Sequence, residues 1–161
     1  MYSNNGDAME SEISLFDMFS RLGVAAGLAL VLGLERELRG KSAGLRSHML
    51  VALGAAAFLI VGLEILFATA EGDPSARIDP TRIVEGVIGG IGFLGAGSII
   101  RSGASVHGIT TGASIWLAGA IGVAAGVDNF ALASMVTIMA LVIMSVLGAI
   151  ERTFPNHRGR D

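Results

Sequence analysis

The stretch of sequence that decides the fold runs Gly86-Val-Ile-Gly-Gly-Ile-Gly-Phe-Leu-Gly-Ala-Gly97 and holds no charged or polar side chain. Glycine at this density weakens a helix in water, whereas in a membrane it lets neighbouring helix backbones approach one another closely. Residues 90–95 also match the dinucleotide-binding pattern G-x-G-x-x-G, but that pattern needs a preceding strand and a following helix, which the surrounding sequence does not predict. We therefore predict a tightly packed membrane helix, with a broken or re-entrant helix lining a cavity as the alternative.

The composition of the whole chain supports a membrane location. Of its 161 residues, 52% are hydrophobic and only 16% are charged, whereas soluble domains have about 25% charged residues. The chain has no cysteine, which excludes disulfides and thiolate metal sites. Its net charge of -3 and the lack of a basic stripe argue against nucleic-acid binding.

Five apolar segments predict an all-α, polytopic transmembrane helical bundle of about five closely packed, glycine-rich helices. Each segment is near the roughly 20 residues that cross a bilayer. The segments are 13–34, 47–68, 82–100, 109–126 and 130–150, so that residues 13–150 form one transmembrane domain. A charged loop at 35–46 and a polar turn at 101–108 are expected between helices, and polar tails at 1–12 and 151–161 flank the domain.

Lysine and arginine residues set the expected orientation. Eight of the 11 fall in segments 35–46, 101–108 and 151–161, and the other three fall in segments on the opposite side of the bilayer. Basic residues concentrate in cytoplasmic segments. We therefore expect the N-terminus outside and the C-terminus in the cytoplasm.

Glycine spacing predicts which helices lie at the centre. Small residues four apart favour close helix contact, and they are frequent in the first, third and fourth predicted helices but rare in the fifth. We therefore place those three helices at the centre and the fifth at the lipid edge. The glycines of the third helix expected to make the contacts are Gly86, Gly90, Gly92, Gly95 and Gly97. Gly92→Leu should then disrupt folding far more than Ala140→Leu on the fifth helix.

Charged residues gather in the loop expected between the first two helices. Glu35 and Arg39 are four apart and suited to pairing, and the basic side chains suit a cytoplasmic loop near anionic lipid headgroups. Two acids at the C-terminal end of a helix are unfavourable with its dipole, so a buried ionic network linking the two helices is the alternative. The candidate functional residues of this loop are Glu35, Arg36, Glu37, Arg46 and His48.

A second charged group lies around the start of the glycine-rich helix. Asp79 is suited to cap that helix, but acids inside membrane helices are also functional candidates, and Mg²⁺ prefers carboxylate oxygens with water. The candidates are Asp79, Arg82, Glu85 and Glu64, of which the three acids are weak candidates for ligands of an unknown metal. The positive charge of Arg82 disfavours binding of a dehydrated cation nearby. We therefore expect Asp79 and Arg82 to form a structural ion pair that is essential to function.

Three motifs resemble the signatures of one family of bacterial membrane proteins. Gly33-Leu-Glu-Arg-Glu37 followed by Ala43-Gly-Leu-Arg-Ser-His48 resembles the first signature of the MgtC/SapB family. Asp79-x-x-Arg82 followed by the glycine run at 90–97 is similar to the second signature, and Val106-x-Gly-x-Thr-Thr111 is similar to the third.

The resemblance covers residues 17–150 and implies a multi-pass protein of the bacterial inner membrane. It implies a role in growth at low magnesium and, in pathogens, in survival inside macrophages. The implied activity is regulation by binding other membrane proteins such as F-type ATP synthase subunits, with transport of Mg²⁺ or another cation as the alternative. Many members carry a C-terminal soluble domain of ACT type, for which this sequence is expected to be too short.

The remaining expectations concern partners and chemistry. Membrane lipid and a second copy of the chain are the other partners that fit. No nucleophile and base are spaced for catalysis, so we expect no enzyme activity. We expect no cofactor, apart from Mg²⁺ at the acids named above.

Overall fold

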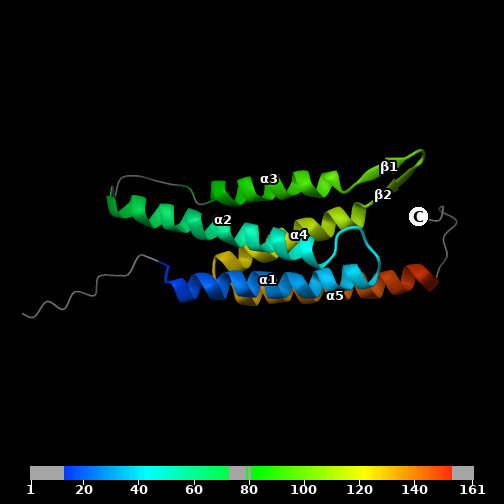
Figure 1. Ribbon diagram of the computed structural model, residues 1–161, viewed down its shortest axis with the longest axis horizontal. Coiled ribbons are helices and arrows are strands. Elements are labelled where there is room, and N and C mark those ends of the chain that lie inside the picture. Colours follow the sequence, from blue (N-terminus) through cyan, green and yellow to red (C-terminus); the bar gives the residue numbers. More distant parts are fainter. Residues whose placement is uncertain (1–12, 73–78, 80, 154–161) are drawn as a thin grey trace, which may run out of the picture.

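The computed structural model describes residues 13–72, 79 and 81–153, and it confirms an all-α helical bundle. Five helices run alongside one another on the long axis of the molecule (Figure 1). Their bounds are α1 Leu15–Leu38, α2 Leu45–Gly72, α3 Thr81–Gly97, α4 Ile109–Gly126 and α5 Phe130–Thr153. The tail predicted at 1–12 lies outside the described residues, as does the predicted C-terminal tail beyond the end of α5.

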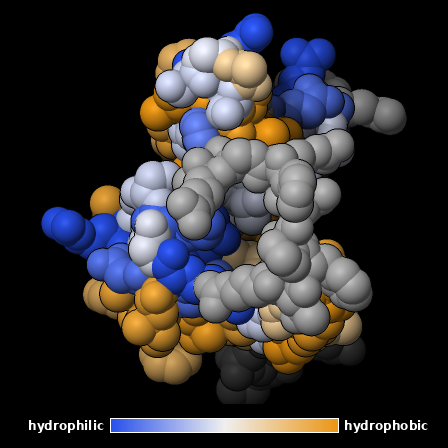
Figure 2. All heavy atoms as spheres, turned by 90° about the vertical axis from the view of Figure 1, so that its right-hand side faces the viewer, coloured by the Kyte–Doolittle hydropathy of each residue, from blue (hydrophilic) through white to orange (hydrophobic). Residues whose placement is uncertain are grey.

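Successive helices alternate in direction, so their connections divide between the two ends of the bundle (Figure 1). The α1–α2 loop and the segment between α3 and α4 lie at one end, where α5 also finishes. Hydrophilic side chains gather at this end beside hydrophobic helix surfaces (Figure 2). The alternation follows the up-and-down path predicted from the sequence, and the side of the membrane that each end faces stays a prediction.

Four helices, α1, α2, α4 and α5, are long and apolar enough to cross a membrane. Helix α3 has 17 residues, which at ~1.5 Å per residue reach about 25 Å, less than the roughly 30 Å of the hydrocarbon core. It ends at Gly97 because the chain then enters an antiparallel hairpin of β1 Ile100–Ser102 and β2 Ser105–His107. These strands were not predicted; Gly103, which has a positive φ in their turn, was the available signal.

Helix α4 is the centre of the bundle, because it packs against each of the other four helices. Its buried Ile121 and Ala125 meet Ala52 and Ala56 of α2 in an apolar core of mostly small side chains. Helices α1 and α2 also pack extensively against each other. The central position of α1 and α4 confirms the prediction, but α2 takes the place that the sequence analysis gave to α3.

Glycines in α4 permit these contacts. A Cβ atom at Gly122 would lie 2.2 Å from the carbonyl oxygen of Ala52 on α2, and one at Gly126 would lie 3.1 Å from the backbone of Ala56. Side chains at these positions would push α4 away from α2. Close approach of two membrane helices through small residues is therefore realised between α4 and α2.

The packing role predicted for the α3 glycines is wrong at four of five positions within this chain. Gly95 does meet another helix, since a Cβ there would lie 3.1 Å from the carbonyl oxygen of Gly112 on α4. In the described structure nothing beyond nearby α3 backbone lies within 4 Å of a Cβ at the other four, which are Gly86, Gly90, Gly92 and Gly97. Small-residue spacing indicates that a helix face allows close approach, but it does not identify the neighbour.

Helix α5 lies at the edge of the bundle, as predicted. It packs on α4 and α1 with one side, on which Ala133, Thr137 and Ala140 are buried. Because Ala140 is 4% exposed while Gly92 faces open space, the structure gives no reason for Gly92→Leu to be the more disruptive of the two changes.

Candidate functional site: a polar cluster joining three helices

Polar side chains from three helices meet inside the bundle at the end where α1 and α2 are joined. Arg36, in the last turn of α1, is 3% exposed, and His48, near the start of α2, is 0% exposed. Thr111 and Ser114, near the start of α4, are buried as well. Since buried polar groups need hydrogen-bond partners, we take these four residues, called the polar cluster below, as the candidate site.

His48 connects α2 to α4 through its ring nitrogens. Nδ1 lies 2.8 Å from the carbonyl oxygen of Gly44, and Nε2 lies 3.0 Å from Ser114 Oγ. Because a carbonyl oxygen only accepts, Nδ1 carries a hydrogen and donates it. Ser114 Oγ also lies 2.9 Å from the carbonyl oxygen of Thr111, so its single hydrogen is donated either to that oxygen or to Nε2. The protonation of His48 and the hydroxyl orientation of Ser114 are therefore coupled.

Arg36 connects α1 to α4. One terminal nitrogen of its guanidinium donates to Thr111 Oγ1 at 3.3 Å, while its Nε makes no hydrogen bond to any described residue. The carboxylate of the adjacent Glu35 forms the ion pair with Arg39 that their spacing predicts. Neither Glu35 oxygen accepts a well-aligned hydrogen bond in the described part of the chain, so this contact is an ion pair without hydrogen-bond geometry.

The second acid at this end of α1, Glu37, contacts the start of α2. The helix continues to Leu38 instead of ending at residue 34, so Glu35, Arg36 and Glu37 lie on the helix and not in the predicted loop. Glu37 Oε2 accepts a hydrogen bond of 3.0 Å from the backbone nitrogen of Leu45, the first residue of α2. The carboxylate thus serves the N-terminus of the next helix, where negative charge is favourable.

The segment forms neither the simple cytoplasmic loop nor the ionic network between α1 and α2 that was its alternative: its one ion pair among the described residues lies within α1, and its buried hydrogen bonds lead to α4. The structure brings Arg36 and His48 together inside the bundle with Glu35 beside them, whereas Arg46 is exposed on α2. Thr111 and Ser114 were not predicted as site residues. Their spacing of three residues in a mostly apolar helix was the signal that could have found them, because residues three apart share one face.

At the other end of the bundle, Asp79 serves the first turn of α3. Its Oδ1 accepts hydrogen bonds from the backbone nitrogen of Thr81 at 2.9 Å and from the Thr81 hydroxyl at 2.7 Å. These hydrogen bonds lower the pKa of Asp79 below its ordinary value. The predicted ion pair between Asp79 and Arg82 is not formed: within the described residues, the pair of Glu35 and Arg39 is the only one. The Asp79 carboxylate is engaged by Thr81 instead.

The three acids proposed as metal ligands do not converge. Across the described ranges, no three His, Asp or Glu side chains lie close enough together to hold a metal ion. Asp79 and Glu85 are exposed, and Glu64 is half-buried on α2. The functional roles predicted for these residues stay predictions.

Comparison with known proteins gives consistent matches. The family model described as "MgtC family" matches residues 22–153. The chain is 39% identical over 126 residues to the "Putative magnesium transporter YhiD" of Escherichia coli (strain K12), which covers 78% of this chain and 58% of that protein. It is 38% identical over 133 residues to "Protein MgtC" of Salmonella typhimurium (strain LT2), covering 83% and 53%. The chain thus spans about half the length of these relatives, and no solved structure matches it.

Proposed function

The chain belongs to the MgtC family, and on that premise we propose that it is a regulatory protein of the bacterial inner membrane that supports adaptation to low Mg²⁺. It acts by binding other membrane proteins, and subunits of the F-type ATP synthase are the first partners to test. In a pathogen the same activity supports survival inside macrophages.

The main observation that supports this proposal is that the polar cluster links three helices by hydrogen bonds. His48 and Arg36 each reach α4 from a different helix, so α1, α2 and α4 are held as one unit. Along the rest of α4 the buried residues are apolar or glycine, among them Ala118, Ile121 and Ala125. A transporter needs a polar site near the bilayer midplane between elements that move, and a fixed apolar centre suits a protein that works through its outer surface.

Transport of Mg²⁺ or another cation is the second candidate function. One relative carries the words "magnesium transporter" in its name, and Asp79, Glu85 and Glu64 all lie toward the end of the bundle opposite the polar cluster. Their separation in the described structure weighs against a shared cation site, which is why we place transport second.

The two functions differ in whether the purified chain moves Mg²⁺. The chain is expressed in a bacterium lacking its own family member, growth is measured at low Mg²⁺, and Mg²⁺ uptake is measured in proteoliposomes with an enclosed indicator dye. Restored growth with uptake no faster than in empty liposomes supports regulation. Uptake above that of empty liposomes, and reduced by Glu64→Gln, overturns regulation in favour of transport.

The partner is tested separately in inverted membrane vesicles. ATP-driven proton pumping by the F-type ATP synthase is followed with and without the chain, at equal synthase content. Pumping that is slower when the chain is present supports the synthase as partner. Equal pumping rates would exclude the synthase as the partner. They would not change the conclusion drawn from the growth test at low Mg²⁺.

A further inference from the structure

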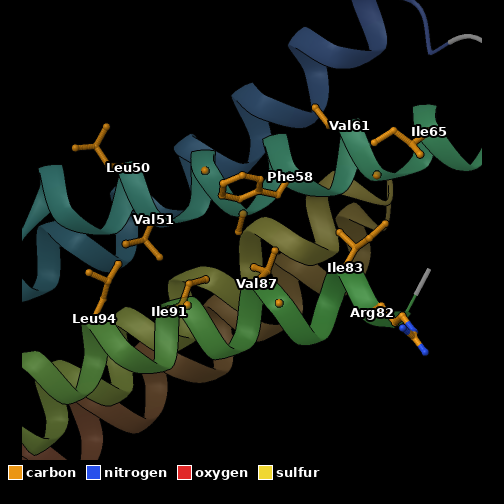
Figure 3. A pocket seen from close by; sticks show the side chains of 15 residues that line it. Leu50, Val51, Phe58, Val61, Ile65, Arg82, Ile83, Val87, Ile91 and Leu94 are labelled. Atoms are coloured by element: carbon orange, nitrogen blue, oxygen red, sulfur yellow. The ribbon is translucent and has the colours of Figure 1, made fainter. Parts of the chain in front are cut away.

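An apolar groove of about 800 Å³ runs between α2 and α3 (Figure 3). Val87 and Ile91 of α3 point into it from one wall, and Phe58 of α2 lies on the other wall (Figure 3). Near one end the two walls touch, because the Ile83 side chain occupies the space that a side chain at Gly62 would need. The described side chains thus leave an elongated space unfilled between two helices that are already in contact.

The groove is open to the surroundings of the bundle along its side. Phe58 is 66% exposed, and Leu50 and Leu94, near the far end of the groove (Figure 3), are exposed as well. Because α2 is long and apolar enough to cross a membrane, these surroundings are lipid. From Ile65 to Leu50 the groove follows α2 for about 22 Å at ~1.5 Å per residue. One leaflet supplies about half of the roughly 30 Å hydrocarbon core, so an acyl chain of one leaflet can lie in the groove along its whole length.

Glycines on both walls make the groove deep. Gly54 of α2 and Gly86 and Gly90 of α3 line it, and a Cβ atom at any of them would meet nothing within 4 Å in the described structure. Side chains at these positions would fill part of the groove. A hydrocarbon chain is one carbon wide and gains dispersion energy from walls on both sides. A helix is about 10–12 Å across and cannot enter between two helices that touch.

Arg82 supplies a positive charge at one end of the groove. It is the only charged residue among the described ones that line the groove, and its side chain points out of the groove at the start of α3 (Figure 3). Its guanidinium forms no ion pair with a described residue. Of the acids nearby in the sequence, Asp79 accepts hydrogen bonds from Thr81, and Glu85 does not line the groove. A long arginine side chain can follow an apolar surface while its guanidinium reaches the headgroup region, where it binds phosphate oxygens through two N–H groups.

We propose that the groove between α2 and α3 binds one anionic phospholipid, with an acyl chain between the two helices and the phosphate on Arg82. An apolar groove as long as one leaflet, with a cation at one end, is complementary in shape and charge to such a lipid. The bound lipid extends the contact of α3 with α2, which is less extensive than its contact with α4. This proposal does not depend on which membrane protein or ion the chain serves.

Quenching of tryptophan fluorescence by brominated lipids tests the site. The chain has one tryptophan, Trp116, so Trp116→Phe allows a single tryptophan to be placed elsewhere. Phe58→Trp puts it in the groove, and Ile138→Trp, at an exposed position of α5, is the matched control. The purified variants are reconstituted in bilayers of phosphatidylcholine and phosphatidylglycerol, with one or the other lipid brominated in its acyl chains. The two quenching levels give the relative binding constant of the two lipids at each tryptophan.

The charge of Arg82 determines the expected lipid preference. We expect Phe58→Trp to report that phosphatidylglycerol binds about fivefold more strongly than phosphatidylcholine, the effect of one arginine near an anionic headgroup. Ile138→Trp should report a ratio near one, because it faces freely exchanging lipid. Adding Arg82→Gln to Phe58→Trp should bring the ratio in the groove close to one as well. Because Arg82 is exposed, this change should leave the fold intact.

Two leucine substitutions on α3 test the shape of the groove separately from its charge. Gly90→Leu places a side chain in the groove, whereas Gly92, two residues further on, does not line it. A Cβ at either position meets nothing within 4 Å in the described structure, so both variants should keep the helix content of the wild type by circular dichroism. We expect Gly90→Leu to lower the ratio reported by Phe58→Trp toward one, and Gly92→Leu to leave it unchanged.

Three results would overturn the proposal. One is an equal lipid ratio at Phe58→Trp and Ile138→Trp. Another is a ratio at Phe58→Trp that stays the same after Arg82→Gln, or after Gly90→Leu, in a variant that keeps its helix content. The last is weak quenching of Phe58→Trp by both brominated lipids under conditions that strongly quench Ile138→Trp, which would assign the groove to a protein segment.

Discussion

Helices α3 and α4 are both rich in glycine, yet they use it differently. In α4, a Cβ at Gly112, Gly119, Gly122 or Gly126 would collide with a neighbouring helix. Of the six glycines of α3, only Gly95 lies against a neighbouring helix, where a Cβ would make a tight contact of 3.1 Å with the carbonyl oxygen of Gly112. Glycine content therefore indicates that a helix can be approached closely, while the identity of what approaches it depends on the three-dimensional arrangement.

The two helices also differ in how their polar groups are used. Inside the bundle, the hydroxyls of Thr111 and Ser114 on α4 are hydrogen-bonded to side chains of α1 and α2. The charges of Arg82 and Glu85 on α3 face outward and pair with no described residue. The polar groups of α4 are thus used within the chain, whereas those of α3 are exposed.

The most direct test of this difference between α3 and α4 is to place the same bulky side chain on each helix. Gly122→Leu on α4 would drive a side chain into the backbone of Ala52 on α2, and we expect it to cost at least about 3 kcal/mol or to abolish folding. Gly92→Leu on α3 meets open space and should leave the monomer close to wild type. Unfolding of the purified chains by SDS in mixed micelles measures both.

Gly92→Leu should keep the helix content and unfolding midpoint of the wild type. If Gly92→Leu unfolds as readily as Gly122→Leu, the assignment of an open face to α3 is wrong.

The second test concerns the polar cluster. His48→Ala removes the contacts to Gly44 and Ser114 and leaves a cavity in a fully buried site. We expect a loss of about 2–4 kcal/mol from unsatisfied polar groups and lost packing. Ser47→Ala, at the exposed neighbouring position, should change stability by less than about 0.5 kcal/mol. Equal unfolding midpoints for the two variants would show that the cluster does not hold the helices together.

The sequence was sufficient to predict the helical bundle, because length and hydropathy report on the bilayer directly. Helix α4 was predicted with the bounds it has, Ile109–Gly126, since apolar residues fill it and turn residues follow. The end of α1 was placed at residue 34, whereas the helix continues to Leu38. Charged residues suggested a loop there, but Glu35 pairs with Arg39 within α1, while Arg36 and Glu37 form hydrogen bonds to α4 and α2.

The candidate site was predictable only in part. The spacing of Glu35 and Arg39 is local, so their ion pair was foreseen, and it is present. The partners of Arg36 and His48 lie 75 and 66 residues further along the chain. No local pattern specifies such contacts, because they depend on how α4 packs between α1 and α2.

A smaller effect is expected where α1 meets the start of α2. Glu37→Ala removes the carboxylate that accepts the backbone N–H of Leu45, which we expect to cost about 1 kcal/mol. Arg46→Ala, which removes an exposed charge one residue into α2, is the control and should be nearly neutral. Faster amide hydrogen exchange over the first turn of α2 in Glu37→Ala, but not in Arg46→Ala, would confirm the cap. Unchanged exchange would mean that water replaces the carboxylate at no cost.

The smallest effect is expected at Asp79, where cap and charge can be separated. Asn caps a helix about as well as Asp, so Asp79→Asn keeps the acceptor for Thr81 and removes only the charge. Hydrogen bonds from Thr81 depress the pKa of Asp79 in the folded protein. The stabilisation from this carboxylate is therefore present above the ordinary pKa near 4 and is lost as pH falls through the lower folded value. Opening of the first turn of α3 below about pH 4 should thus appear in the wild type and not in Asp79→Asn. The sequence analysis expected Asp79 to be essential through an ion pair with Arg82. Because that pair is not formed among the described residues, we now expect Asp79→Asn to restore growth at low Mg²⁺ nearly as well as the wild type. If growth fails while the variant reaches the membrane in normal amount, the negative charge itself is required, and the outer end of α3 becomes an ionic site in its own right.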